Sequence, residues 1–367
     1  MRLIAVCVLA ALVSACASRP CVQGAKPHLP APPLPTANLL GQQPLCEASG
    51  AAWVPCETGA GRCLLVADNE NKHELFLFDV AGATLTGQRP VPLRAPAGSA
   101  AIKDAEGLAR VGDRIFVVGS HSRRSWDKTP PACTLDEQRL AFGLFDWRDG
   151  VLTGTPVRTA LADWQRLLQA DDCRRSLIVP TDAASSALAG RLCDAIAAGQ
   201  AVAEQSREGC AQGVNVEGVA AVASTGGAPP RIWFGLRGPL LGERAVLLRL
   251  ASMETLRFDA LVTLDLHGDG VRDLAVADGS LWILAGPSAD FQQAGTLWRL
   301  PLTDLRDGAA LSPALAVPGL PPFSEAIAID PDSGAAFLLV DGDEETGPGD
   351  GNGCPIAARY LPLDLPR

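Results

Sequence analysis

Three glutamates stand at the head of copies of one short motif, and their carboxylates are the side chains best suited to chemistry. The clearest copies are Glu106-Gly107-Leu108-Ala109 and Glu217-Gly218-Val219-Ala220. Weaker copies are Arg272-Asp273-Leu274-Ala275 and Glu325-Ala326-Ile327-Ala328, and a degenerate one is Ser49-Gly50-Ala51-Ala52. If the copies are equivalent around one axis, their first residues bring carboxylates, a guanidinium and a hydroxyl together.

Two kinds of chemistry fit such a cluster. Glu106, Glu217 and Glu325 could hold a hard cation such as calcium through oxygen ligands. Guanidinium groups match carboxylates and phosphates instead. In that case the sequence predicts a small or anionic ligand bound by Arg237, Arg272, Arg123, Ser120 and Glu325.

Catalysis and a closed channel are the further interpretations of the same residues. Glu106 or Glu217 with His121 could supply an acid and a base for hydrolysis. Alternatively, Arg272 and the glutamates neutralise each other in a closed polar channel. Asp341-Gly342-Asp343-Glu344-Glu345 favours a solvated acidic loop over a calcium loop, because Thr346 and Asn352 stand where an EF-hand needs Gly and Glu.

The spacing of the motif predicts the fold that would position these residues. Its second residues are 50, 107, 218, 273 and 326, which gives intervals of 57, 111, 55 and 53. Each unit continues with a Gly or Asp turn and further short apolar strands. Four strands at a period near 55 predict an all-β fold, a β-propeller. A two-sheet sandwich is the alternative, but it does not explain the recurring motif.

The double interval contains either a divergent blade or an insertion. Residues 183–203 are rich in Ala, with Leu188, Leu192 and Ile196 at helical spacing. We therefore expect a helical insertion over 161–212 and favour five blades, with six as the alternative. In a blade, the start of the first strand and the end of the second emerge on the same face. The motif heads should therefore meet Ser120, His121 and Arg237 at one channel mouth.

The N-terminus has the pattern of an export signal. Arg2 precedes an apolar run that is too short to span a bilayer. Val13-Ser14-Ala15-Cys16 resembles the lipobox of bacterial lipoproteins, which implies lipidation of Cys16; ordinary signal-peptidase cleavage near Ala17 is the alternative. We expect a signal peptide over 1–15, an anchor and Pro-rich tether over 16–45, and a propeller over 46–367. Ala17 implies the outer membrane, facing the periplasm.

Composition limits the class of partner. The 367 residues carry a net charge of −10, which disfavours nucleic acid, and 47% of them are hydrophobic, which suits a folded core. We expect membrane contact through the lipid anchor only, and the sequence names no protein partner.

The 11 cysteines fit an oxidising compartment. Cys56 and Cys63 flank one turn and could pair across it. We expect at least one bridge among Cys173, Cys193 and Cys210. Cys133 and Cys354 lie in long loops, and Cys21 is the expected unpaired thiol.

The chain resembles a bacterial family known as domain of unknown function 3616. The resemblance lies in segments from about residue 45 to the C-terminus, namely Asp104-Ala105-Glu106-Gly107-Leu108-Ala109, Val118-Gly119-Ser120-His121-Ser122, Asn215-Val216-Glu217-Gly218-Val219-Ala220, Gly235-Leu236-Arg237-Gly238-Pro239, Gly270-Val271-Arg272-Asp273-Leu274 and Ile283-Leu284-Ala285-Gly286-Pro287. It implies a propeller-like fold and no established activity. The repeats are also similar to phytase-like and lactonase-like propellers, as a fold-level analogy.

Three functions remain open from sequence. The favoured one is an exported lipoprotein propeller that binds a small or anionic ligand at the channel mouth. The second is a calcium-assisted hydrolase of phosphoester or lactone bonds. The third is a structural or protein-binding propeller of the envelope. Whether the protein is an enzyme stays undecided at this point.

Overall fold

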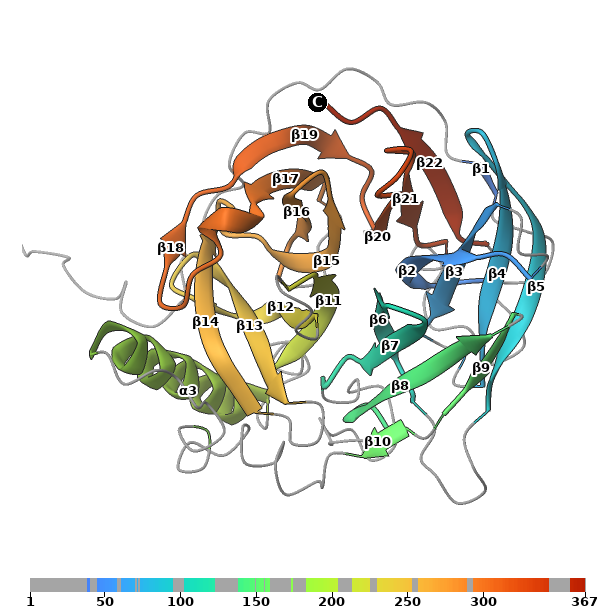
Figure 1. Ribbon diagram of the computed structural model, residues 1–367. Helices are drawn as coiled ribbons and strands as arrows, with labels where there is room; N and C mark the ends of the chain where they lie inside the picture. The colour runs from blue at the N-terminus through green and yellow to red at the C-terminus, as the bar shows by residue number, and fades with distance from the viewer. Residues whose placement is uncertain are drawn as a thin grey trace, which may run out of the picture.

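A computed structural model shows four β-sheets that form a ring of five blades, because the largest sheet contains two blades. Each blade has an inner strand near the centre and successive strands farther out (Figure 1). The residues that it describes are 38–39, 45–57, 61–69, 71, 73–94, 102–122, 138–148, 150–154, 156–158, 173, 183–203, 213–224, 230–252, 257–288, 293–342 and 357–366. The ring is a β-propeller, as the sequence predicts. No sixth blade occurs among these residues, so the favoured count of five is confirmed for them.

The first two blades come from the N-terminal half of the ring. Blade 1 contains β2 (Ala48–Pro55), β3 (Arg62–Asp68), β4 (Glu74–Ala81) and β5 (Thr84–Arg94). Blade 2 contains β6 (Ala105–Val111), β7 (Arg114–Gly119), β8 (Ala141–Arg148) and β9 (Val151–Thr153), and β10 (Pro156–Arg158) also pairs with β8. A parallel pairing of β5 with β9 joins the outer edges of these two blades.

The remaining blades complete the ring. Blade 3 contains β11 (Asn215–Val222), β12 (Arg231–Leu241), β13 (Arg244–Ser252) and β14 (Arg257–Asp265), with β18 (Ala310–Leu311) parallel to β14. Blade 4 contains β15 (Gly270–Ala277), β16 (Ser280–Gly286), β17 (Gly295–Pro301) and β19 (Ala314–Leu320), with the 3-10 helix η3 (Leu302–Asp304) after β17. Blade 5 contains β20 (Ser324–Ile329), β21 (Ala336–Val340), β22 (Arg359–Leu363) and β1 (Asn38–Leu39).

Both ends of the chain contribute to blade 5, and this closes the ring. β1 pairs antiparallel with β22, where Asn38 faces Tyr360 and Leu39 faces Arg359. Asn38 and Leu39 lie within the segment expected to be tether, yet they belong to the sheet. The inner strands then follow one another around the centre, because β2 lies against β6, β6 against β11, β11 against β15, β15 against β20, and β20 against β2.

The hydrophobic core is divided into five clusters, one at each blade interface. The third and fourth residues of the motif build these clusters from opposite sides. Ala109 of blade 2 and Val219 of blade 3 share one cluster, and Ala220 of blade 3 and Leu274 of blade 4 share the next. The recurring motif is therefore explained by burial, because each copy supplies one residue to the blade on each side of it.

Helix α3 (Ala183–Ala203) lies outside blade 3 and packs on β12 and β14 (Figure 1). Leu192 and Ile196 enter the core cluster between blades 2 and 3. Ser185 donates a hydrogen bond of 2.9 Å to Asp307, whose carboxylate also accepts the amide of Leu261 at 2.8 Å. A helix thus stands in the double interval, where the sequence predicts one.

Two disulfides stabilise the described part of the chain. Cys56 bonds to Cys63 across the turn between β2 and β3, and Cys173 bonds to Cys193 in α3. Both confirm the sequence predictions, and Cys46 is also disulfide-bonded. Cys21, Cys133, Cys210 and Cys354 lie outside the described residues, as does the segment 1–16 that is expected to contain a signal peptide and a lipobox.

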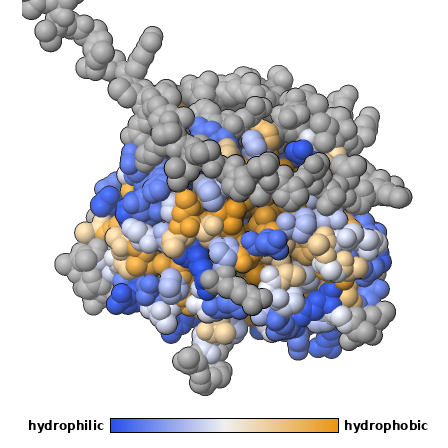
Figure 2. All heavy atoms as spheres, turned by 90° about the horizontal axis from the view of Figure 1, so that it is seen from above, coloured by the Kyte–Doolittle hydropathy of each residue, from blue (hydrophilic) through white to orange (hydrophobic). Residues whose placement is uncertain are grey.

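The outer edge of the ring that Figure 2 shows from above is chemically mixed, with apolar side chains gathered among polar ones. Among the described helices, none is long and apolar enough to cross a membrane.

Candidate functional site

Each of the five inner strands carries a β-bulge at the same place. The pairing register shifts between Ala105 and Gly107, between Val216 and Gly218, and at the matching points of the other three strands. The extra residue is the head of the motif in every blade: Ser49, Glu106, Glu217, Arg272 and Glu325. A bulge takes its extra residue out of the pairing pattern and redirects its side chain. We call these five residues the bulge ring.

Glycine at the second motif position lets the inner strands approach closely. A Cβ on Gly107 would lie 2.6 Å from Val219 Cγ1 and 3.1 Å from the carbonyl oxygen of Glu217 in the next blade. Gly50 and Gly218 meet the backbone of the following blade in the same way. In blades 1, 2 and 3 the motif therefore places its polar first residue close to the next blade because the second residue has no side chain.

Asp273 occupies the glycine position in blade 4 and bonds to the next blade instead. Its carboxylate accepts the amide of Leu274 at 2.7 Å and that of Ile327 in blade 5 at 2.8 Å. Burial raises the pKa of Asp273 well above its usual value, against the lowering effect of these two hydrogen bonds.

Arg272 connects three blades through ion pairs. Its Nη1 lies 2.6 and 2.7 Å from the two carboxylate oxygens of Glu325 in blade 5 and 3.4 Å from Oε2 of Glu217 in blade 3. Arg237 lies in β12, the strand that pairs with β11. Its Nη1 lies 2.9 Å from Oε1 of Glu217. Asn215 also donates to that oxygen, at 2.9 Å. Four of the charged residues predicted from sequence thus form one cluster.

This cluster is largely buried, and its charges balance. The side chains of Arg272, Glu217 and Glu325 are 8%, 4% and 9% exposed. Two guanidinium groups face two carboxylates, so the pairs offset the cost of removing these charges from water. Ser49 completes the ring without a charge and donates to the carbonyl of Ala105 at 2.5 Å.

Glu106 is the bulge-ring carboxyl that no hydrogen bond or ion pair joins to another described residue. Burial raises its pKa well above the usual value, and the neighbouring carboxylates of Asp104, Glu217, Glu325 and Glu47 raise it further. Its neighbour Asp104 is paired, because Arg139 lies 3.1 Å from the Asp104 carboxylate. Glu106 is therefore the member of the ring most easily held in the protonated, hydrogen-bond-donating form.

Ser120 and His121 lie at the end of β7, close to this acidic side of the ring. The amide of Ser120 donates to the backbone carbonyl oxygen of Asp104 at 2.8 Å, and the carbonyl of Ser120 accepts the amide of Val216 at 2.6 Å. Ser120 therefore links blade 2 to blade 3.

His121 is buried, and Nδ1 lies 2.7 Å from the carbonyl oxygen of Gly119. Burial lowers the pKa of His121 to about 4, so its imidazole is neutral near pH 7. The other predicted residues of this mouth, Arg123 and most of the 341–345 acidic loop, lie outside the described residues.

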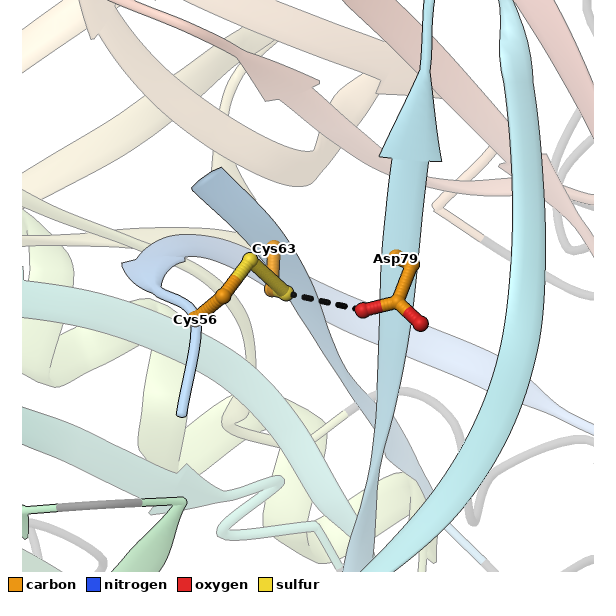
Figure 3. Close-up of side chains that lie close together, drawn as sticks. All are labelled: Cys56, Cys63 and Asp79. Carbon is orange, nitrogen blue, oxygen red and sulfur yellow. Dashed lines mark hydrogen bonds between the residues drawn. A yellow bond between two sulfur atoms is a disulfide. The ribbon is translucent and has the colours of Figure 1, made fainter. Parts of the chain in front are cut away.

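One group of side chains in the described part of the chain has the spacing of metal ligands, and it lies in blade 1, on β3, β4 and the turn before β3. It consists of Cys56, Cys63 and Asp79, with Sγ of Cys63 lying 3.4 Å from Oδ1 of Asp79 (Figure 3). The two sulfur atoms form a disulfide, which leaves no thiolate for a metal. Asp79 is held by Arg89 through two hydrogen bonds of 2.8 and 3.0 Å. These residues stabilise the edge of the blade.

A cavity of about 360 Å³ lies along the same channel, beyond the bulge ring. Its lining begins two residues after each motif head and continues toward the C-terminal ends of the inner strands. Sequence reasoning missed this cavity because its residues are mostly alanine, leucine, valine and isoleucine, which carry no chemical signal. The constant alanine at the fourth motif position was the one indication of open space there.

Comparisons with known proteins give a family and distant structural likeness. A family model described as "Protein of unknown function (DUF3616)" matches residues 92–312. No curated protein matches the chain. Solved structures that are similar include the glutaminyl cyclase of Myxococcus xanthus, with 10% identity, a TM-score of 0.41, and coverage of 90% of this chain and 96% of that one.

Two further solved structures show a similar degree of likeness. The exo-beta-1,3-galactanase of Phanerochaete chrysosporium has 8% identity and a TM-score of 0.45, with coverage of 90% of this chain and 64% of that one. U3-55K has 8% identity and a TM-score of 0.37, with coverage of 89% and 97%. The blade count and the position of the site therefore rest on the sheet topology of this chain.

Proposed function

The chain belongs to this family of unknown function, and we propose that it is an exported, lipid-anchored propeller that binds a small anionic ligand at the bulge ring. The observation that supports this role is the meeting of Arg237 and Arg272 at Glu217. Two guanidinium groups from neighbouring blades stand within 3.4 Å of one carboxylate, in a place that draws on all five inner strands.

The two guanidinium groups at the ring can hold an anion, and they compete with a metal cation for the carboxylates. A ligand carboxylate or phosphate would share the two guanidinium groups with Glu217, and charge-assisted bonds of this kind are strong. The pKa of Glu106 is raised by burial and by the neighbouring carboxylates, and in its protonated form Glu106 would donate a further hydrogen bond to the ligand. A calcium ion would instead compete with Arg272 for the carboxylates of Glu217 and Glu325.

Export is supported by cysteine chemistry as well as by the lipobox. Disulfides persist in oxidising compartments and are rare in the cytoplasm. The bonds Cys56–Cys63 and Cys173–Cys193 therefore favour the envelope as the site of action. Anchoring through Cys16 would hold the propeller at the membrane surface through the Pro-rich tether.

The experiment is a calorimetric titration of the purified protein with phosphate, citrate and gluconate, in chelator and then in calcium. We expect at least one of these anions to bind in chelator, and Arg237→Gln to weaken binding roughly tenfold through loss of a charge-assisted hydrogen bond. Arg249→Gln is the matched control, because Arg249 pairs with Asp259 at 2.7 Å in the same blade but outside the ring.

Two outcomes would count against the proposal. One is that none of the three anions binds with or without calcium. The other is that binding requires calcium and disappears in Glu217→Gln, which would favour the calcium-assisted alternative. A parallel screen with phosphoester and lactone substrates tests whether binding leads to hydrolysis.

A further inference from the structure

The cavity beyond the bulge ring is lined mostly by apolar residues, whereas the bulge ring itself is polar. Every inner strand contributes to its wall, and the first lining residues are Ala51, Leu108, Val219, Leu274 and Ile327. The alanines at the next position continue the wall. Its volume of about 360 Å³ falls in the range of small-molecule pockets, which are mostly apolar with a few polar groups.

Two arginines belong to the lining, and they differ in their partners. Arg62 forms ion pairs with Asp330, at 3.1 Å, and with Asp332, so its charge is neutralised. Arg110, near the end of β6, donates through Nε to the carbonyl of Gly112 at 2.8 Å. No ion pair joins Arg110 to an acidic residue in the part of the chain that the structure describes.

The cavity thus combines an apolar wall with one cation whose charge is not balanced by a described carboxylate. We propose that this cavity binds a small organic anion with an apolar body, whose negative group is held by Arg110. The apolar body leaves water for a wall that the five inner strands build with alanine, leucine and valine residues, and this favours binding in proportion to the apolar area covered. The negative group pairs with the guanidinium of Arg110, whereas a neutral apolar ligand would form no such ion pair.

This site does not depend on the proposed function, because it uses other residues at the other end of the channel. A ligand at the bulge ring is polar and faces Arg237 and Arg272. A ligand in the cavity is amphipathic and faces Arg110. One site can fail in a binding experiment while the other is retained.

The test uses three probes that share one apolar chain and differ in their head group: octanoate, octanol and octylamine. Titration of the full-length mature protein should show octanoate binding with one-to-one stoichiometry, roughly tenfold more tightly than octanol. Octylamine should bind most weakly of the three. Equal affinities for octanoate and octylamine, or no octanoate binding, would overturn the proposal.

Variants locate the binding. Arg110→Gln should reduce octanoate affinity to that of octanol and leave octanol unchanged. Arg114→Gln is the matched control, because Arg114 pairs with Val111 in the same hairpin and is not part of the cavity wall. Equal losses in Arg110→Gln and Arg114→Gln would mean that overall charge, and not this site, recruits the anion.

Ala275→Phe tests the cavity itself, because Ala275 is a half-buried residue of the wall. We expect it to abolish binding of octanoate and octanol while phosphate, citrate and gluconate are unaffected. Retained octanoate binding in a folded Ala275→Phe protein would overturn the proposal. If that variant does not fold, the probe series and Arg110→Gln still decide the question.

Discussion

The charged residues of the bulge ring are not equivalent, although the sequence motif makes them look alike. Glu217 and Glu325 are held by guanidinium groups at 2.6 to 3.4 Å. Glu106, in the same position of blade 2, faces other acids and has a raised pKa. The difference comes from the neighbouring blade, which places Arg272 beside two of the three glutamates and leaves the third among carboxylates.

Glu106 should make folding pH-dependent. Because its pKa is raised in the folded protein, the folded state binds the proton more tightly than the unfolded state does. Its contribution to stability is therefore complete below the ordinary pKa of a glutamate and is lost as the pH rises through the raised value. Glu106→Gln should be more stable than wild type at neutral pH, and this difference should disappear at acidic pH.

Urea unfolding of both proteins between pH 4 and 8 measures this effect. Asp113→Asn is the control, because it removes an exposed carboxyl from the turn of the same hairpin. If the free energy of unfolding of Glu106→Gln equals that of the wild type at every pH, the raised pKa of Glu106 is contradicted.

At the scale of the element, four consecutive residues in the first half of each inner strand both position a polar side chain and pack the neighbouring blades together. The bulge presents a polar side chain, and the glycine after it allows the neighbouring strand to approach. The next two residues enter the cores on opposite sides. This combination explains why the motif is repeated while the outer strands vary, since only the inner strands meet around one axis.

Gly107 is the position where this arrangement is most sensitive to a side chain. A Cβ there would lie 2.6 Å from Val219 Cγ1, with Val118 and backbone of Glu217 also close. We expect Gly107→Ala to destabilise the protein by about 1–3 kcal/mol through overpacking. Gly213→Ala is the control, because a Cβ at Gly213 would meet nothing within 4 Å.

Thermal and urea unfolding of these two variants provide the measurement. Equal stability of Gly107→Ala and Gly213→Ala would show that the inner strands can separate, and would remove the packing explanation of the motif.

At the scale of the whole molecule, the ring is closed by pairing β1 with β22, so the chain enters the propeller beside the strand where it ends. A tether attached before β1 therefore connects to blade 5. This geometry suits the proposed anchoring through Cys16, which would hold the propeller near a membrane by its N-terminal segment.

Lipid anchoring gives a prediction for the whole molecule. Cys16→Ser should lose incorporation of labelled fatty acid and should move from the membrane fraction to the soluble envelope fraction. Cys21→Ser, in the same tether, should keep both properties. A Cys16→Ser protein that still carries the label and sediments with membranes would exclude the lipobox interpretation.

Much of the fold could be predicted from spacing. The intervals near 55 residues predict a propeller, and the alanine-rich segment predicts a helix at the position of α3. The disulfide Cys56–Cys63 was predictable because its two cysteines flank one turn. A bridge among Cys173, Cys193 and Cys210 was also predictable, but only the structure shows that Cys173 bonds to Cys193. The contribution of Asn38 and Leu39 to blade 5 was not, since two residues in a Pro-rich segment carry no strand pattern.

The sequence by itself determined which residues head the inner strands, because a repeated motif folds into repeated local structure. Only the tertiary structure decided how they pair, since Arg272, Glu217 and Glu325 are brought together by backbone approach between blades that are distant in the chain. It also decided that the channel has an apolar cavity beyond the polar ring. Alanines and leucines mark no site in a sequence, and a cavity is formed by the space that five strands leave between them.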